Sequence, residues 1–166
     1  MATVAQVSLA EYLRTDYEPP RELIGGELVP KPMGTLEHMS MERTLARMLA
    51  VFEHRGLGHV MHELSWRNAD EVRIPDVVFY RSGARMQDGI LIDPPLLAIE
   101  ILSPSQRQSE LFAKCEAYHA WGAPCCWVID PSTKTAWEYH CGETVESKKD
   151  LLTAGEITIS IADLFA

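Results

Sequence analysis

The sequence contains no long apolar run and no leader-like beginning. Its apolar stretches are far shorter than the roughly 20 residues that a membrane-spanning helix needs. The first residues, Met1–Gln6, lack the basic region and the apolar core of a signal peptide. We therefore expect a cytoplasmic protein that does not enter a membrane.

Cysteine is scarce and carries no paired motif. The four cysteines are Cys115, Cys125, Cys126 and Cys141, and no two of them form C-x-x-C, which excludes a zinc ribbon and a thioredoxin-type site. Cys115 and His119 are four residues apart and can share a helix face, as a pair of metal ligands would. Since no second pair has matching spacing, we expect reduced, partly buried thiols.

Positive charge is also in short supply, because the net charge is −9. A broad electrostatic attraction for nucleic acid needs a basic surface, so this class of binding is disfavoured. A nuclease remains compatible with the charge, since active-site carboxylates add negative charge that bound cations offset locally. Any affinity for DNA is then expected to be weak, metal-dependent or helped by dimer geometry.

The length and composition are those of an ordinary globular protein, with 166 residues, 46% hydrophobic and 23% charged. We expect one domain over residues 1–166. Periodicity and turn residues predict helices at 8–14, 35–54 and 106–121, a hairpin at 22–29, strands at 59–66, 72–80, 96–102, 125–130 and 135–140, and a last strand at 157–161 before a short turn. This order predicts an α/β or α+β fold, a mixed sheet with helices packed on it.

Two carboxylates in apolar strands are the most informative feature. Glu100 lies at the centre of Leu96–Leu102, a run typical of a strand buried on both faces. Asp76 has a similar setting in Ile74–Tyr80. A buried carboxylate normally becomes neutral, pairs with a cation or binds a metal. If the two strands are neighbours, both carboxylates can bind one Mg²⁺, or Mn²⁺ in its place.

The motifs around these carboxylates resemble a known family. Pro75-Asp76 followed by Glu100 resembles the PD-(D/E)XK nuclease pattern, and Leu97–Ser105 resembles the Uma-type family of proposed restriction endonucleases within that superfamily. The resemblance covers nearly the whole chain, with further matches at Glu22–Val29, His38, Lys114 with Tyr118, Gly122, Cys126–Pro131 and Leu164-Phe165. It implies a restriction-endonuclease-like fold, a mixed β-sheet flanked by α-helices.

The resemblance also implies roles for individual residues. The superfamily's lysine normally lies two residues after the acidic residue, but that position is Leu102 here, so the implied lysine is Lys114 on the following helix. It would orient the attacking water and offset charge on the phosphate. Glu27 would add a third carboxylate, and His38 would hydrogen-bond a water, a carboxylate or the phosphate.

Substrate contacts are expected just after the Glu100 strand. Ser103 follows it directly and can cap the next helix or contact phosphate, and Arg107 can face phosphate one turn before Glu110. Purely structural roles remain open as alternatives. Glu27 also fits an exposed hairpin residue, and His38 also fits a core histidine whose hydrogen bonds are satisfied.

These expectations combine into a Mg²⁺-dependent endonuclease that hydrolyses phosphodiester bonds, with DNA as the expected substrate. A homodimer is expected because cutting both strands of a duplex favours two symmetric sites. One alternative is a catalytically inactive module of the same fold that binds nucleic acid or a protein partner. Another is a hydrolase of a different substrate class with zinc bound through His62 or His119 and a cysteine.

Overall fold

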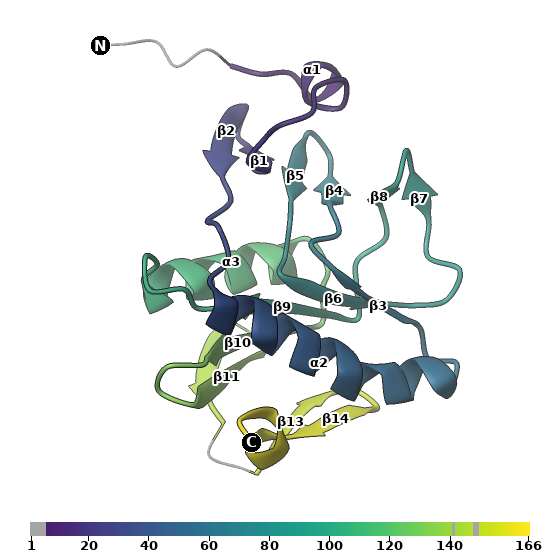
Figure 1. The fold of residues 1–166 in the computed structure, drawn as a ribbon. Coiled ribbons are helices and arrows are strands. Elements are labelled where there is room, and N and C mark those ends of the chain that lie inside the picture. Colours follow the sequence, from purple (N-terminus) through teal and green to yellow (C-terminus); the bar gives the residue numbers. More distant parts are fainter. Residues whose placement is uncertain (1–5, 141, 148–149) are drawn as a thin grey trace.

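The computed structural model describes residues 6–140, 142–147 and 150–166 (Figure 1). Met1–Ala5 and Cys141, which entered the expectations above, lie outside these residues. The elements in chain order are α1 (Leu9–Tyr12), β1 (Arg21–Ile24), β2 (Glu27–Pro30), α2 (Leu36–His54), β3 (His59–His62), β4 (Trp66–Asn68), β5 (Glu71–Arg73), β6 (Val77–Tyr80), β7 (Met86–Gln87), β8 (Ile90–Leu91), β9 (Leu97–Ile101), α3 (Gln108–Ala120), β10 (Cys125–Asp130), β11 (Thr135–His140), β12 (Glu143–Glu146), β13 (Leu151–Ala154), β14 (Ile157–Ser160) and α4 (Ile161–Leu164).

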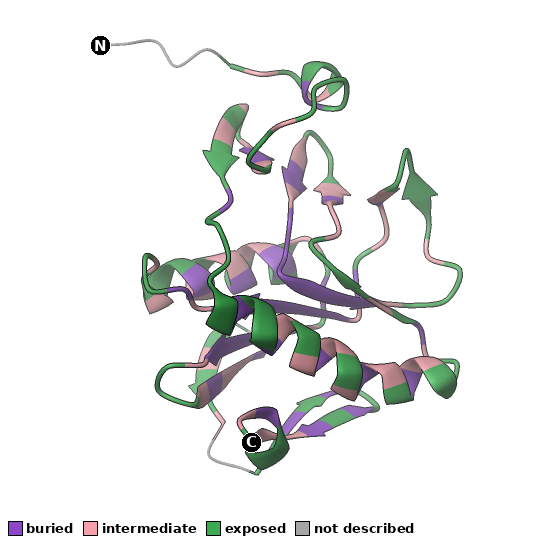
Figure 2. Cartoon of the chain, in the orientation of Figure 1, coloured by how far each residue is buried: buried purple, intermediate pink, exposed green. Residues whose placement is uncertain are grey.

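A mixed central sheet has the strand order β12-β11-β10-β9-β6-β3. Strands β9 and β10 are parallel and are joined through α3, whereas the other neighbours in this sheet are antiparallel. Every residue of β9 is buried, as the apolar run around Glu100 predicted (Figure 2). The mixed sheet with flanking helices confirms the expected fold class.

The two long helices cover opposite faces of this sheet. Alternate residues of β9 belong to different apolar clusters, Ile99 to the one that contains α2 and Ala98 to the one that contains α3. On α2, the residues Met41, Leu45 and Leu49 lie at helical spacing and are buried. Glu100 therefore lies in a sheet that is covered by a helix on each face.

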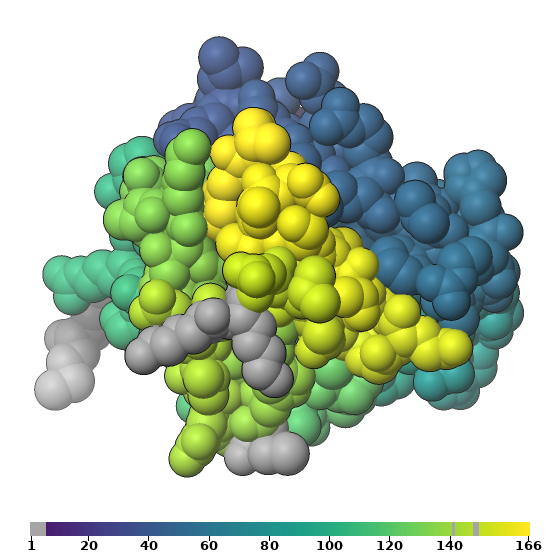
Figure 3. All heavy atoms as spheres, turned by 90° about the horizontal axis from the view of Figure 1, so that it is seen from below, coloured from purple at the N-terminus to yellow at the C-terminus, as the bar shows by residue number. Residues whose placement is uncertain are grey.

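The C-terminal segment completes the α2 face. Strands β13 and β14 form an antiparallel hairpin, and α4 follows directly. Figure 3 shows this segment, in yellow, between α2 and the strand β11. Its residues Leu152, Ile157 and Leu164 belong to the same apolar cluster as α2.

Two expected strands are each broken in two, and this break positions the site. Residues 59–66 contain all of β3 and the first residue of β4, and residues 72–80 divide into β5 and β6. Pro75 has no N–H to donate to a strand ladder, so pairing stops there. Strands β4 and β5 belong to a second sheet, of order β2-β1-β5-β4-β8-β7, while β3 and β6 belong to the central one. Asp76 consequently lies at the corner between the sheets, just before β6.

None of the helices in the described residues is both long enough and apolar enough to cross a membrane.

The short strands β7, β8, β12 and β13 are elements that the sequence pattern did not predict.

The α2 stripe gives a direct test of the core. Leu45 is 0% exposed, whereas Leu36, on the same helix, is 82% exposed. Because Leu45→Ala leaves a cavity in the core, we expect it to lower the free energy of unfolding by about 2–5 kcal/mol. The matched change Leu36→Ala should alter it by no more than about 0.5 kcal/mol. Urea unfolding of both variants checks this, and equal losses would show that α2 is packed differently.

Candidate active site

Asp76 and Glu100 lie next to each other at the end of two adjacent strands. In the antiparallel pair of β6 and β9, Val77 is opposite Ile99, and one further step of this register brings Asp76 opposite Glu100. The backbone N–H of Ile101 donates a hydrogen bond to Asp76 Oδ2 at 2.7 Å. The carboxylates are 4% and 1% exposed, respectively. They are therefore close enough for each to influence the charge of the other.

The Asp76 carboxylate is held by a lysine and a histidine. Lys31 Nζ donates to Asp76 Oδ1 at 2.6 Å and to the carbonyl of Ile74 at 2.9 Å. His38 Nε2 lies 3.2 Å from Asp76 Oδ2. Burial alone would raise the pKa of Asp76, but the hydrogen bond from His38 and the charge of Lys31 outweigh it and lower the pKa well below its usual range. Asp76 is therefore a carboxylate at neutral pH.

The Glu100 carboxylate is held from α3. Tyr118 Oη donates to Glu100 Oε1 at 2.5 Å, and Lys114 Nζ donates to Glu100 Oε2 at 3.2 Å. Burial raises the pKa of Glu100, and the Lys114 charge opposes that effect only in part. Burial also raises the pKa of the Tyr118 phenol well above its usual value, with the Glu100 charge acting in the same direction. Tyr118 therefore stays a hydrogen-bond donor.

A third buried carboxylate comes from the N-terminal hairpin, at a different position from the expected one. Glu22, on β1, is 1% exposed, accepts a hydrogen bond from the Ile74 N–H at 2.8 Å, and lies 3.6 Å from Lys114 Nζ. Glu27, on β2, is exposed, and across the described residues it forms no hydrogen bond or ion pair with this cluster. The two acidic residues face different surroundings because they lie on different strands of the hairpin.

Sequence reasoning missed two members of this cluster. Glu22 is followed by two apolar residues, Leu23 and Ile24, and the pattern was interpreted only as one strand of a hairpin. A carboxylate beside a short apolar run is nevertheless the same kind of signal that identified Glu100. Lys31 lies between Pro30 and Pro32 in the linker to α2, and no local pattern marks it as buried. Lys31 is nevertheless only 6% exposed, and the Asp76 carboxylate compensates its buried charge.

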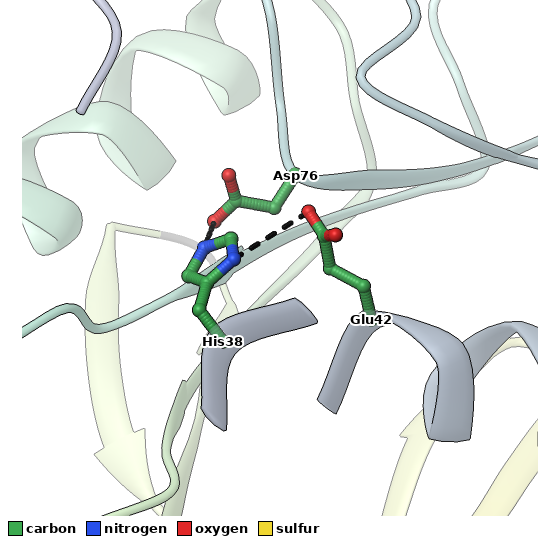
Figure 4. Close-up of side chains that lie close together, drawn as sticks. All are labelled: His38, Glu42 and Asp76. Carbon is green, nitrogen blue, oxygen red and sulfur yellow. Dashed lines mark ion pairs between the residues drawn. The ribbon is translucent and has the colours of Figure 1, made fainter. Parts of the chain in front are cut away.

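On the other side of Asp76, α2 contributes a histidine and a glutamate. Thr35 caps the helix by accepting a hydrogen bond from the His38 N–H, and one turn further on Glu42 faces the same ring. Figure 4 shows the His38 ring between Asp76 and Glu42, with one ring nitrogen toward each carboxylate. Burial would lower the pKa of His38, but its hydrogen bond to Asp76 and the charges of Asp76 and Glu42 together outweigh burial and raise that pKa.

The two expected substrate contacts differ in exposure. Ser103 is 4% exposed, and its backbone N–H and carbonyl both pair with Gln106 in the turn after β9. Arg107 is exposed, and its backbone N–H donates to the Glu110 carboxylate at the beginning of α3. Arg107 is thus free to meet a phosphate, whereas burial of Ser103 suits a role in fixing this turn.

The donor set at Asp76 fits a divalent cation. One ligand atom from each of His38, Glu42 and Asp76 lies within 4.8 Å of the others, and over the described residues this is the single such group of three or more His, Cys, Asp or Glu side chains. Hard oxygen donors of this kind suit Mg²⁺ and Mn²⁺. The expected alternative zinc ligands are separate from it: His62 is exposed, and His119 Nδ1 lies 3.1 Å from the Ala123 carbonyl.

Comparison with known proteins gives a family match and matches among solved structures. A family model described as "Uma2: Putative restriction endonuclease" matches residues 9–163. The crystal structure described as "a putative nuclease belonging to DUF820 from Anabaena variabilis ATCC 29413" superimposes with a TM-score of 0.84 and 26% sequence identity, over 96% of this chain and 97% of that one. No curated protein matches the chain.

The hydrogen bond from Tyr118 to Glu100 can be tested by removing one atom. Tyr118→Phe leaves Glu100 Oε1 buried without this donor, so we expect the free energy of unfolding to fall by about 1–3 kcal/mol. Tyr139→Phe is the matched control, since Tyr139 is 5% exposed and its hydroxyl has no hydrogen-bond partner within the described residues. Urea unfolding at neutral pH measures both changes. A control that costs as much as Tyr118→Phe would contradict the assignment.

Proposed function

Because the chain belongs to the Uma2 family, whose model is described as a restriction endonuclease, we propose that it hydrolyses phosphodiester bonds in a metal-dependent reaction. The observation that carries this proposal is the pair of buried carboxylates, Asp76 and Glu100, on adjacent strands with a buried lysine beside each. An apolar core has no structural need for such a cluster, and active sites are where buried, interacting ionisable groups accumulate.

Asp76 and Glu100 are the proposed metal ligands, with Mg²⁺ or Mn²⁺ as the ion. When bound, the ion would supply charge stabilisation at the phosphate and a more acidic bound water. Glu100 would exchange one of its present donors for the ion, since Lys114 and Tyr118 now occupy its two oxygens. Glu22 remains beside Lys114 to balance its charge in either arrangement.

Lys114 is proposed to position the attacking water and to offset charge on the phosphate. Burial opposes its charge, but Glu100 and Glu22 outweigh burial and raise its pKa above the usual lysine value. Lys114 is therefore protonated at neutral pH, so it acts as a hydrogen-bond donor and not as a general base. Its side chain is 17% exposed, which leaves it accessible at the edge of the cluster.

The remaining roles concern orientation and substrate. His38 is proposed to hold the Asp76 carboxylate in place through its Nε2, and Arg107 to contact phosphate at the beginning of α3. DNA is the proposed substrate, and a homodimer is the proposed form, because two symmetric sites can cut both strands of a duplex. Glu27 is better suited to the exposed hairpin than to the reaction.

A second candidate function is supported by one observation. Both Asp76 and Glu100 already have a lysine within 3.2 Å, and such pairs can satisfy buried carboxylates without a metal. On this basis the chain would be a nuclease-fold module that binds nucleic acid or a protein partner without cutting it. Direct assay of cleavage and binding separates the two functions.

We expect the purified protein to cut plasmid or single-stranded DNA in Mg²⁺ or Mn²⁺ and to lose that activity in Asp76→Asn and Glu100→Gln. Removing a group that stabilises the transition state typically costs about 10²–10³ in rate. Asp70→Asn and Glu116→Gln, at exposed positions, are charge-matched controls that should retain activity. Cutting that survives both active-site substitutions would overturn the assignment. Binding of nucleic acid by an inactive wild type would favour the second candidate.

The Lys114 assignment has a separate test. Lys114→Met should lower kcat by about 10²–10³ with a smaller effect on KM, because the ammonium acts mainly on the transition state. Lys134→Met, at an exposed lysine, is the control. Steady-state cleavage kinetics measure the split, and an unchanged kcat in Lys114→Met would remove this residue from the mechanism. Thermal unfolding of each variant verifies that the kinetics come from folded protein.

A further inference from the structure

The segment that joins β2 to α2 exposes three large apolar side chains. Met33 and Leu36 are each 82% exposed, and Met39 is 58% exposed. The rest of residues 32–37 is exposed as well (Figure 2). A single exposed apolar side chain is ordinary on a protein surface, but three of them so close together in the chain form a patch, which indicates contact with another molecule.

This apolar patch lies beside the candidate active site. Lys31, two residues before Met33, donates to Asp76 Oδ1 at 2.6 Å. His38, two residues after Leu36, has its Nε2 3.2 Å from Asp76 Oδ2. Because successive Cα atoms are about 3.8 Å apart, the Cα atoms of Met33 and Leu36 each lie within about 8 Å of the Cα of a residue that contacts Asp76. A nucleic acid strand bound at Asp76 therefore passes close to the patch.

The segment is fixed at both ends. The backbone N–H of Lys31 donates to the carbonyl of Pro20 at 3.0 Å, and Thr35 caps α2 through a side-chain hydrogen bond of 3.2 Å. Between these anchors, a Cβ at Gly34 would lie 3.4 Å from the Met39 side chain. The methionine therefore packs closely over this glycine. An apolar patch that is held in this way can press into a partner without first having to be ordered.

The charge of the segment favours contact with bases over contact with phosphates. None of residues 32–36 is charged, and the whole chain has a net charge of −9, which disfavours broad attraction for phosphates. Contact with uncharged bases does not depend on that charge. Proteins that enter the minor groove insert side chains such as Met, Leu and Pro between neighbouring base pairs, which unstacks and kinks the duplex.

We propose that Met33 and Leu36 form a wedge that enters a DNA duplex between two neighbouring base pairs, next to the phosphodiester bond that is cut. Met39 supports the wedge from α2. This inference rests on the proposed function and assigns the residues through which the same site takes a duplex. Since TA and CA/TG steps unstack most easily, the wedge favours cleavage near such steps.

The patch is too small to be the main contact with a second copy of the chain. A stable interface takes about 800 Å² and roughly 20–30 residues from each partner. Three side chains provide only a small part of such an area, whereas one base step accommodates two of them. Size and position beside Asp76 thus point to the same occupant, the substrate duplex.

The direct probe is a short DNA duplex with 2-aminopurine at a central TA step, because the fluorescence of this base rises when it is unstacked. Full-length Glu100→Gln protein, in Mg²⁺, is expected to leave the duplex uncut. We expect it to raise the fluorescence and to lose this effect when Met33→Ala and Leu36→Ala are added. The matched control adds Met61→Ala and Leu151→Ala, at residues that are 47% and 45% exposed on β3 and β13, and should keep the effect.

Cleavage kinetics give a second readout. In otherwise wild-type protein, Met33→Ala with Leu36→Ala should lower kcat/KM for duplex DNA by roughly tenfold or more, because two apolar side chains lose their burial between bases. Single-stranded DNA has no base step to open, so its kcat/KM should change by less than about twofold. Urea unfolding verifies that the doubly substituted protein is folded.

Four results would overturn the proposal: no binding of the duplex, an unchanged fluorescence rise without the wedge, equal losses of kcat/KM on duplex and single-stranded DNA, or a dimer that dissociates in sedimentation when the wedge is removed. The last result would assign the patch to an interface between copies. A wedge-dependent rise in a protein that cuts no nucleic acid supports the wedge and rejects the nuclease proposal, whereas cleavage without such a rise does the reverse.

Discussion

Keeping negative charge inside an apolar sheet is the constraint on which this structure depends. Asp76, Glu100 and Glu22 are all almost fully buried, and an uncompensated carboxylate in such a place costs several kcal/mol. Compensation comes from segments far apart in the sequence, namely Lys31 in the linker before α2 and Lys114 on α3. The linker and α3 are thereby tied to the same corner of the central sheet.

The sequence was sufficient to predict the components of the site whose signal is local. Glu100 stands out because it is a carboxylate in a continuous apolar run, and the helix at 35–54 is predicted because its apolar residues recur with a helical period. The break at Pro75 shows what local pattern leaves out. Residues 72–80 read as one strand, but the missing N–H of Pro75 divides them between two sheets, and only the tertiary arrangement decides where each part pairs.

Long-range partners escaped prediction for the same reason. Lys31 has no periodic neighbours that mark it as buried, and Glu22 and Glu27 are equivalent in pattern until the hairpin is placed against Ile74. Lys114 was found through family resemblance, and the structure explains how a lysine on a helix reaches this site. Lys114 and Tyr118 are four residues apart, so they share one face of α3 and approach the same carboxylate. Leu102, at the superfamily's usual lysine position, packs against the α3-side apolar cluster instead.

The two sides of the site differ in how completely their polar atoms are used. Both oxygens of Glu100 have a protein donor, whereas across Asp76 the atoms His38 Nδ1 and Glu42 Oε1 have none in the described structure. A site that had decayed into an inert ion-pair cluster would be expected to satisfy its buried atoms throughout, since each unsatisfied one costs free energy and contributes nothing. The unsatisfied pair lies on the α2 side. The two sides of Asp76 thus differ in kind: the α3 side is a satisfied network of lysine, tyrosine and carboxylate, whereas the α2 side has unused hydrogen-bonding capacity.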